Sequence, residues 1–343
     1  MAEGESEFVD QPLVTIVIIN YNGRKWLNLC LTSIKNLRYR PHEVILVDNA
    51  SSDTSVQYAA KHFPWIRIVK NTKNFGYAEG CNIGARCARG EIIAFLNQDI
   101  KVDPYWLSHL VSTLKQGNVG ACCGKLFDYE GERILFPMES DLPYPSECQE
   151  IRMVYGAAFA TRKDVIEKIG LFDPKFFMYY EEIDWSWRLR LANYKCIYVP
   201  EATAYHWVGG SDTTFERIVY LSYRNRIRTL IKNCELETLL FFVPLIVLEI
   251  GGCLLSLLYS DFAASWFSES PRKPISGLAL VKGCIKGIAW NIINIRDTMR
   301  ERAKIQKLRV ILDKKLKPKE QDFFYQKFLK ILGRSHTQAF EPI

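Results

Sequence analysis

Apolar and polar positions along the first hundred residues alternate between two periods. Short apolar runs predict strands at residues 13–20, 42–49, 66–71 and 91–97. Amphipathic spacing between those runs predicts helices at 24–37, 54–62 and 77–88. Strands that alternate with helices are typical of a parallel sheet covered on both faces. We therefore expect an α/β fold with a mostly parallel sheet flanked by helices.

The pattern is less regular from residue 120 to about 215, as expected of the second half of a mixed α/β domain. Residues 152–170 predict a strand, a glycine turn and a short helix, residues 176–194 a loop followed by a helix, and residues 195–207 a strand. The character of the chain changes near Thr214. We expect an N-terminal tail at 1–12, an α/β domain at 13–215 and a helical C-terminal region at 216–343.

Polar clusters follow three of the predicted strands: Asn20-Tyr21-Asn22, Asp48-Asn49 and Asn97-Gln98-Asp99. In open α/β sheets the ligand crevice lies outside the carboxyl ends of the strands. One polar strand end is an ordinary loop, but three at the same edge predict a binding site.

Two of the polar segments have both a functional and a structural interpretation. Asp48 at a strand tip can accept hydrogen bonds from a nucleobase or a ribose, or it can form an Asx turn ahead of the helix near Thr54. Residues 71–90 are rich in amides and glycines. Such residues let a backbone approach a diphosphate closely, or they only provide turns and close helix packing. The P-loop pattern GxxxxGK[ST] is absent.

Asp99, two residues after Asn97, is a candidate ligand for Mg²⁺ or Mn²⁺. These ions need only one or two protein carboxylates when substrate phosphates and water complete the shell. The alternative is a helix N-cap ahead of Pro104. His206 is a lone histidine among aromatic residues, which alone favours a structural role. Opposite a metal–diphosphate centre it becomes a candidate further ligand.

Three acids, Glu181, Glu182 and Asp184, follow the aromatic run at 176–180. Acids in an aromatic environment are partly desolvated, which raises the pKa of a carboxyl group and suits a general base. On a helix that starts here, Glu181, Asp184 and Arg188 share a face, so Asp184 and Arg188 can pair while Glu182 points elsewhere. Acids are also favoured at a helix N-terminus by the helix dipole alone.

Composition and charge narrow the class of protein. The chain has 343 residues, of which 48% are hydrophobic and 24% charged, as in a globular protein. Residues 296–319 carry ten basic and three acidic residues, so this segment accounts for the whole net charge of +7. We therefore expect no nucleic-acid partner for the α/β domain.

The ten cysteines form no CxxC pair, and the acidic N-terminus lacks an apolar core, so we expect reduced thiols, no signal peptide and cytoplasmic residence.

Taken in chain order, seven segments resemble the inverting glycosyltransferases of family 2, in particular the rhamnosyltransferase-like branch. The segments are VTIVIINYNG, ILVDNASSD, NFGYAEGCNIG, FLNQD, GAAFATRK, YYEEIDWSWRLR and HWVGGS, within residues 13–212. The resemblance implies a GT-A fold, which is Rossmann-like, and a nucleoside diphosphate-sugar donor. The substrate-binding positions that it implies are Tyr21, Asn22, Asp48, Asn49, Asn74, Gly76, Asn82, Asn97, Gln98, Gly156, Glu181 and Arg188.

The resemblance also implies the reacting groups. The family's Asp-x-Asp motif falls on residues 97–99, with Asn97 in place of the first acid and Asp99 as metal ligand. His206 is the implied further ligand. The family's catalytic base falls on Glu182, where a glutamate replaces the usual aspartate, and Asp184 is the alternative base.

The C-terminal region predicts contact with a membrane. Residues 239–259 are apolar except for Glu249, and residues 275–295 are apolar but interrupted by Lys282 and Lys286. The first segment is long enough to span a bilayer, but Pro244 and internal glycines favour a re-entrant or interfacial arrangement; a helix buried against the α/β domain is the soluble alternative. With the basic stretch at 296–319, these segments are expected to hold the protein on anionic lipid at the cytoplasmic face of the membrane.

We therefore expect an enzyme that transfers a hexose, for example rhamnose from a thymidine diphosphate donor, to a lipid-linked or polysaccharide acceptor in cell envelope glycan biosynthesis. The alternatives are a nucleotidyltransferase and a membrane-bound scaffold on a degenerate transferase fold. The sugar, the linkage and the oligomeric state are not encoded in any motif that we identify.

Overall fold

The computed structural model describes residues 11–136, 146–207, 213–241, 244 and 277–316. The chain divides into two compact units, Met1–Asp212 and Thr213–Ile343.

Within the first unit, ten strands of the described residues form one sheet in the order β3-β2-β1-β4-β9-β6-β10-β5, with β7 beside β6 and β8 beside β10. The strands are β1 (Val14–Asn20), β2 (His42–Asp48), β3 (Arg67–Lys70), β4 (Ile92–Asn97), β5 (Ile100–Val102), β6 (Val119–Asp128), β7 (Ile134–Phe136), β8 (Gln149–Ile151), β9 (Ala158–Arg162) and β10 (Lys195–His206). The helices are α1 (Arg24–Lys35), α2 (Ser55–His62), α3 (Gly76–Cys87), α4 (Trp106–Leu114), α5 (Lys163–Ile169) and α6 (Glu181–Leu191), with a short 3₁₀ helix η1 (Pro174–Phe176).

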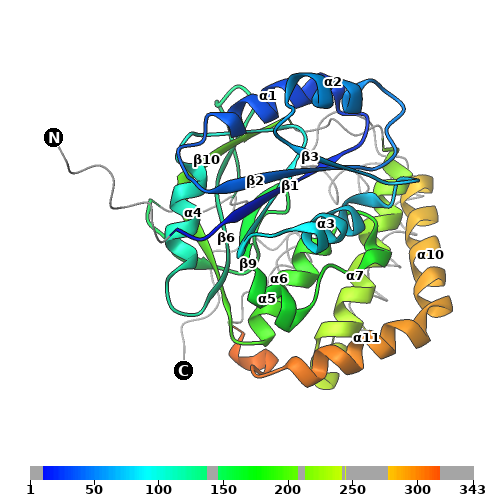
Figure 1. Ribbon diagram of the computed structural model, residues 1–343. Helices are drawn as coiled ribbons and strands as arrows, with labels where there is room; N and C mark the ends of the chain where they lie inside the picture. Colours follow the sequence, from blue (N-terminus) through cyan, green and yellow to red (C-terminus); the bar gives the residue numbers. More distant parts are fainter. Residues whose placement is uncertain (1–10, 137–145, 208–212, 242–243, 245–276, 317–343) are drawn as a thin grey trace. The chain divides into compact units, whose positions relative to one another are not determined.

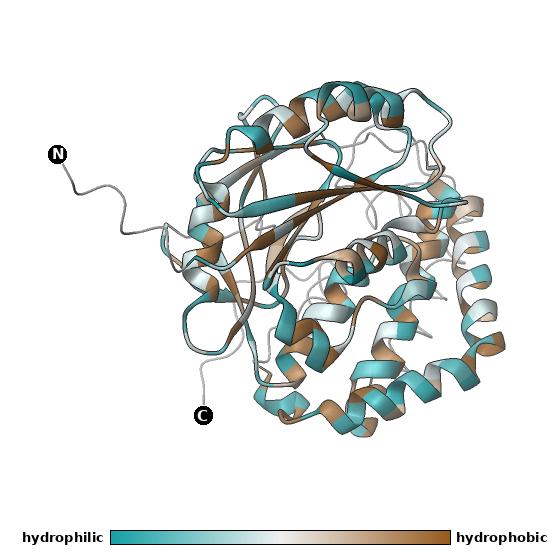
Figure 2. Ribbon diagram, in the orientation of Figure 1, coloured by the Kyte–Doolittle hydropathy of each residue, from teal (hydrophilic) through white to brown (hydrophobic). Residues whose placement is uncertain are grey.

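The core of this unit is the N-terminal half of the sheet. All seven residues of β1 are buried, and α1 and α2 cover one face of the strands while α3 covers the other (Figure 1). Continuous apolar runs are expected of parallel strands that are covered on both faces. Figure 2 shows these strands as the hydrophobic centre, with polar positions on the outer sides of α1 and α2. The predicted strands and helices of residues 13–97 are confirmed to within two residues at each end.

The register of β1 brings two polar strand ends together. β1 is parallel to β2 and to β4, and the pairing places Asn20 opposite Asp48 and Ile19 opposite Asn97. The loops after these three strands therefore leave the sheet at the same edge.

The expectation of a mostly parallel sheet is wrong for the second half of this unit. β9 lies between β4 and β6 and is antiparallel to both, and β5, β7 and β8 also pair antiparallel with their neighbours. A parallel partner needs a crossover connection, usually a helix, and no helix precedes β9 after β6 among the described residues. The apolar pattern of a buried strand does not encode its direction, so the sheet is mixed.

The second unit contains α7 (Phe215–Asn233), α10 (Gly277–Ile293) and α11 (Ile295–Leu308). α7 packs against α10 through a small apolar cluster that includes Val219, Tyr223 and Leu280. Arg228 of α7 is buried and pairs with Asp297 of α11 at 2.8 Å. A buried guanidinium is tolerated only when paired in this way.

The membrane prediction is only partly covered by this unit. Most of residues 239–259 lies outside the described residues. In the described parts of the chain, no single helix is long and apolar enough to span a membrane. The consecutive helices Leu278–Ile293 and Ile295–Leu308, which meet at an angle of 72°, together have the length and composition of a bent span.

Candidate active site

The loops after β1 and β2 are joined by hydrogen bonds between their side chains. The Asp48 carboxylate accepts from Asn20 Nδ2 at 2.7 Å and from Ser51 Oγ at 2.5 Å. Asn22, whose φ is 51°, accepts at Oδ1 from the backbone N–H of Ser52 at 2.8 Å. Asp48 is buried, with 4% of its surface exposed, so its main structural role is to hold the two loops together. Its contact with a nucleobase stays a prediction.

Gln98 joins the loop after β4 to the same edge. Its Oε1 accepts from the Tyr21 backbone N–H at 2.8 Å, and its Nε2 donates to the Tyr21 carbonyl at 3.1 Å. Gly23 lies so close that a β-carbon there would stand 2.2 Å from Gln98 Oε1. The predicted convergence of the three polar strand ends is therefore confirmed, while Tyr21 remains exposed and Asn97 half-buried at its edge.

The start of α3 is held by amides from two segments. Asn74 Oδ1 accepts from the Gly76 backbone N–H at 2.8 Å, and Asn49 Nδ2 donates to the Gly76 carbonyl at 3.0 Å. Gly76 has φ +83°, and a β-carbon there would lie 2.3 Å from the Phe177 carbonyl oxygen. Only glycine fits this position without strain, so it permits the close approach of α3 to the loop before α6.

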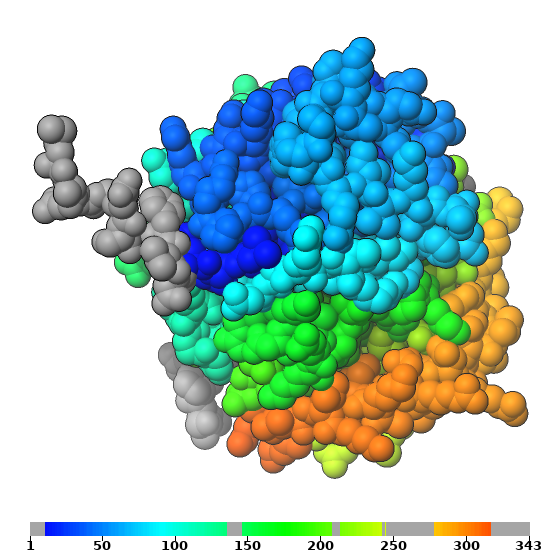
Figure 3. Space-filling model, in the orientation of Figure 1, coloured from blue at the N-terminus to red at the C-terminus, as the bar shows by residue number. Residues whose placement is uncertain are grey.

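Asn82 does not face a donor, contrary to the prediction. It is buried in α3, donates from Nδ2 to the Phe172 carbonyl at 2.9 Å and accepts at Oδ1 from the Phe172 backbone N–H at 3.0 Å. Two reciprocal bonds leave this amide no room for a ligand. Asn82 therefore ties α3 to the segment that leads to α6. Figure 3 shows the cyan part of the chain, which includes α3, bordering the green part.

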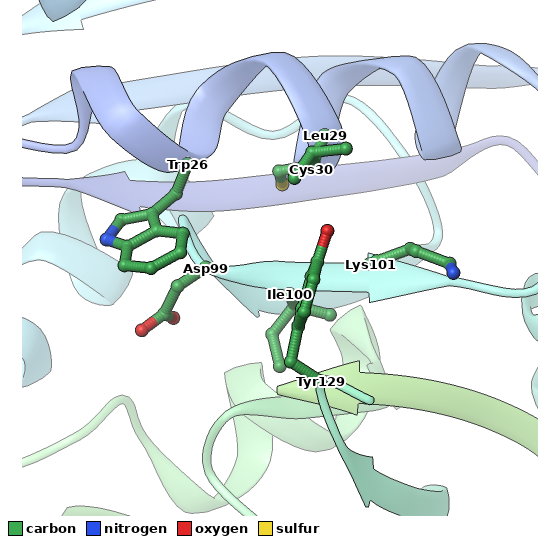
Figure 4. Close-up of a pocket in the computed structure, with 7 residues that line it drawn as sticks. All are labelled: Trp26, Leu29, Cys30, Asp99, Ile100, Lys101 and Tyr129. Carbon is green, nitrogen blue, oxygen red and sulfur yellow. The ribbon is translucent and has the colours of Figure 1, made fainter. Parts of the chain in front are cut away.

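Asp99 and His206, predicted as metal ligands from positions 107 residues apart, lie side by side. His206 Nε2 is 3.5 Å from Asp99 Oδ1, and 12% and 13% of their side chains are exposed. The His206 Nδ1 atom is buried and makes no hydrogen bond within the part of the chain that the structure describes. Asp99 also lines a shallow surface depression between α1 and β5 (Figure 4).

These two groups fit a divalent ion that is shared with a diphosphate. Across the described ranges, no cluster of three or more histidine, cysteine or acidic side chains is placed to hold a metal. One carboxylate and one imidazole match an ion that takes its remaining ligands from phosphate oxygens and water. The imidazole favours Mn²⁺ over Mg²⁺, because Mg²⁺ strongly prefers oxygen ligands.

Glu181 and Glu182 lie in the first turn of α6, and each has one buried carboxyl oxygen that finds no hydrogen-bond partner among the described residues. Burial raises the pKa of Glu181 well above its usual range, and the charge of Glu182 raises it further. Burial also raises the pKa of Glu182, although backbone N–H groups at the helix start oppose the shift. A β-carbon on Gly156 would stand 3.2 Å from Glu182 Cδ, so Gly156 backs this carboxyl group directly.

Tyr155 connects the two halves of the site and was not predicted. Its ring meets the His206 ring edge to face, with centroids 6.3 Å apart. Burial raises the pKa of Tyr155 to about 12, and the charges of Glu182 and Asp99 contribute to the shift. The phenol therefore stays protonated between the metal-ligand pair and the candidate base. The only sequence signal is its position just before Gly156 in VYGAAF.

Asp184 and Arg188, predicted as alternative base and substrate-binding residue, are structural. Asp184 is fully buried and accepts from Arg188 Nε at 3.1 Å. Arg188 also donates to the backbone carbonyls of Ile169 at 2.7 Å and Leu171 at 2.8 Å. A buried carboxylate that holds a guanidinium has no access to a hydroxyl group of an acceptor. The predicted pairing of these two residues is confirmed. The predicted roles of Asp184 as a base and of Arg188 in substrate binding are wrong.

The backbone just before α6 is strained. Phe177, Tyr179 and Tyr180 have φ values of 66°, 70° and 72° without being glycine. Residues in this region cost about 1–3 kcal/mol each and occur most often at functional sites. These residues lie directly before the helix that carries Glu182.

The mixed sheet, the interlaced strand ends and the Asp99–His206 pair define a nucleotide-sugar-dependent transferase of the GT-A-like fold. Residues 15–184 match the family described as Glycosyl transferase family 2. The chain belongs to this family and is a glycosyltransferase.

Named relatives agree with this assignment. A low-salt glycan biosynthesis hexosyltransferase from Haloferax volcanii is 28% identical over 62% of this chain and 74% of its own length. An N-acetylglucosaminyl-diphospho-decaprenol L-rhamnosyltransferase from Mycobacterium tuberculosis is 22% identical over 57% of this chain and 76% of its own length. A mannosyltransferase from Pyrobaculum calidifontis, solved with GDP-Man and Mn²⁺, matches in fold with a TM-score of 0.51 at 17% identity, over 88% of this chain and 86% of that one.

Proposed function

We propose that the chain transfers a sugar, with inversion and with the help of a divalent metal ion, from a nucleoside diphosphate-sugar to a hydroxyl group of a lipid-linked or polysaccharide acceptor. The observation that carries the proposal is the grouping of Asp99, His206 and Glu182 around Tyr155. Rhamnose is the first sugar to test, because one relative is named as an L-rhamnosyltransferase and the motif order resembles that branch.

Each residue of the group has a distinct part in this reaction. Asp99 and His206 would hold Mn²⁺ or Mg²⁺ against the donor diphosphate. When bound, the ion neutralises the charge that develops on the departing nucleoside diphosphate. Glu182 removes the proton of the acceptor hydroxyl group. At the same time the hydroxyl oxygen bonds to the anomeric carbon of the donor sugar, and the bond from that carbon to the diphosphate breaks. Glu181, kept neutral by burial, does not compete for that proton.

The test is release of nucleoside diphosphate from a panel of nucleotide-sugars as a function of Mn²⁺ concentration. Asp99→Asn and His206→Ala are expected to raise the half-saturating Mn²⁺ concentration at least about tenfold, since even partners of metal ligands matter by 10–100-fold. His62→Ala, on the exposed end of α2, is the matched control and should behave as the unmodified protein. Turnover that is independent of Mn²⁺ in all variants would overturn the metal assignment. No turnover of any donor would favour the scaffold alternative.

We also propose that the second unit holds the enzyme on anionic lipid at the cytoplasmic face of the membrane. Leu278, Ile285 and Ile292 recur every seven residues on α10, and 53%, 57% and 67% of their surfaces are exposed. Lys282 and Lys286 stand between them and are exposed. An apolar stripe with interspersed lysines is typical of helices that lie in a membrane interface. Each basic residue near an anionic surface adds about 1 kcal/mol.

Vesicle sedimentation tests this part of the proposal. The full chain should sediment with vesicles of phosphatidylcholine and phosphatidylglycerol, and less with phosphatidylcholine alone. Replacing both Ile285 and Ile292 by Asp should abolish sedimentation. Leu29→Asp, at an exposed apolar position on α1, is the control and should not. Equal sedimentation of both variants would remove the α10 stripe as the membrane contact.

A further inference from the structure

Three aromatic side chains from distant parts of the chain meet beside Asp99. Trp26 of α1 and Trp207, just after β10, have ring centroids 4.6 Å apart at an angle of 38°. Tyr129, just after β6, meets Trp207 at 5.2 Å, edge to face. All three rings are half-exposed. We call Trp26, Trp207 and Tyr129 the aromatic shelf.

A lysine lies over the shelf. Lys25 Nζ is 4.4 Å from the Trp26 ring centroid and 5.3 Å from that of Trp207. Lys25 is exposed, and no carboxylate lies within ion-pair distance of its ammonium group in the described part of the chain. A cation held over aromatic faces without an acidic partner can accept an anionic substituent of a ligand.

The shelf is continuous with the metal-ligand pair. The Trp207 backbone N–H donates to the Asp99 carbonyl at 3.2 Å, and Trp207 follows His206 directly. Trp26, Tyr129 and Asp99 line the same depression, and in Figure 4 the Trp26 ring and the Asp99 carboxylate stand at the same end of it. The depression is too shallow to enclose a ligand, so a group bound here would lie on the surface of the aromatic rings.

The position of Trp26 on α1 argues against the donor nucleoside as that group. Arg24 and Asn28, two residues before and after Trp26, both contact Tyr58 of α2, so this flank of α1 faces α2. Residues two apart on a helix point in nearly opposite directions. Trp26 therefore lies on the flank of α1 that faces away from the interlaced loops of Asp48, where the nucleoside is predicted.

We propose that the aromatic shelf binds the acceptor, with the apolar face of a pyranose ring against Trp26 and Trp207 and a phosphate on the acceptor sugar beside Lys25. Aromatic rings give a large, rigid apolar surface at low entropic cost, and a lysine provides a point charge for phosphate. The inference rests on the proposed function, because it assigns the second substrate of that reaction. It adds an acceptor class, a sugar phosphate or phosphate-linked glycan.

The test is binding of two probes, methyl α-glucoside and glucose 1-phosphate, by saturation-transfer NMR on the full chain in EDTA. Without a divalent ion the diphosphate site is not assembled, so binding there does not contribute. Glucose 1-phosphate should bind more tightly than the methyl glucoside. Trp26→Ala should raise both dissociation constants about tenfold, and Trp26→Phe should restore most of the loss. Lys25→Ala should remove the preference for the phosphate while binding of the methyl glucoside remains.

Trp65→Ala is the matched control, because Trp65 is an exposed tryptophan far along the chain from the shelf, packed only against Phe63 among the ring contacts of the described residues. It should change neither constant. Equal binding by the Trp26→Ala variant and the unmodified chain, or an equal loss in Trp65→Ala, would overturn the proposal. Thermal unfolding of each variant separates loss of binding from loss of fold. Failure of the proposed function would show instead as absent donor turnover, which this binding measurement does not require.

Discussion

Glu182 and Asp184 are two residues apart on one helix, yet their environments predict opposite effects of removing the charge. Asp184 is fully buried and holds the guanidinium of Arg188, which is itself only 6% exposed at its side chain. Breaking a buried ion pair by removing one partner costs about 3–5 kcal/mol. Arg188 keeps its bonds to backbone carbonyls in an Asp184→Asn variant, so we expect the lower end, about 3 kcal/mol.

A loss of about 3 kcal/mol should lower the midpoint of thermal unfolding by about 6–12 °C for a unit of this size. Below that temperature the Asp184→Asn variant should retain most of its kcat, because its carboxylate does not meet the acceptor. Glu182→Gln should leave the unfolding midpoint unchanged or higher, because one carboxyl oxygen of Glu182 is buried with no hydrogen-bond partner in the described parts of the chain. Its kcat should fall by about 10²–10⁴, the usual contribution of a general base.

The assay combines differential scanning fluorimetry with release of nucleoside diphosphate at 20 °C for both variants in parallel. The reasoning is refuted if Asp184→Asn is as stable as the unmodified protein but inactive, since Asp184 would then be the base. It is equally refuted if Glu182→Gln retains full activity.

Three further predictions concern the same site. First, because burial raises the pKa of Glu182 and the base acts when deprotonated, the acidic limb of the kcat–pH profile should lie above the range of an ordinary carboxyl group, and it should disappear in Glu182→Gln. Second, the folded protein holds a proton on Glu181 that the unfolded chain releases above its ordinary pKa, so stability should fall as pH rises through and above that value; Glu181→Gln should raise the unfolding midpoint at pH 8 but not at pH 4. Third, Gly76→Ala should cost at least about 1–2 kcal/mol in denaturant unfolding, because it combines φ +83° with a clash against the Phe177 carbonyl.

Each of these has a matching control. An acidic limb at the position of a free carboxyl group would contradict the buried environment of Glu182. A pH-independent effect of Glu181→Gln would mean that its carboxyl group titrates normally. Gly117→Ala, where φ is +45° but nothing lies within 4 Å of an added β-carbon, separates the backbone cost at Gly76 from the clash.

Much of the fold was predictable because the signals for it are local. β1 to β4 and the helices between them follow from runs of apolar residues and amphipathic spacing, and polar residues at parallel strand ends must share an edge. The direction of β9 was not predictable, because the apolar pattern of a buried strand is the same whether the strand pairs parallel or antiparallel. The sheet order depends on contacts between segments far apart in the chain.

The residues of the candidate site also differ in whether the sequence could predict their roles. The proximity of Asp99 to His206 could be predicted because Asp99 follows β4, His206 ends β10 of the same sheet, and both fit a family pattern. The structural role of Asn82 could not, because its partner, the backbone of Phe172, is 90 residues away and backbone groups carry no sequence signal. Tyr155 was missed for the same reason: its importance comes from its neighbours in space, not from its neighbours in the chain.

The hydrogen bonds that join the loops after β1, β2 and β4 have a consequence for engineering donor preference. The Gln98 side chain is hydrogen-bonded to the backbone of Tyr21, and the Asn22 side chain to that of Ser52, so side chains of one loop partly determine the shape of another. Transplanting one such segment from a relative with a different sugar would leave amides facing mismatched neighbours. Exchange of the three as a single block is the route by which a chimera of this scaffold should retain the hydrogen bonds between these loops.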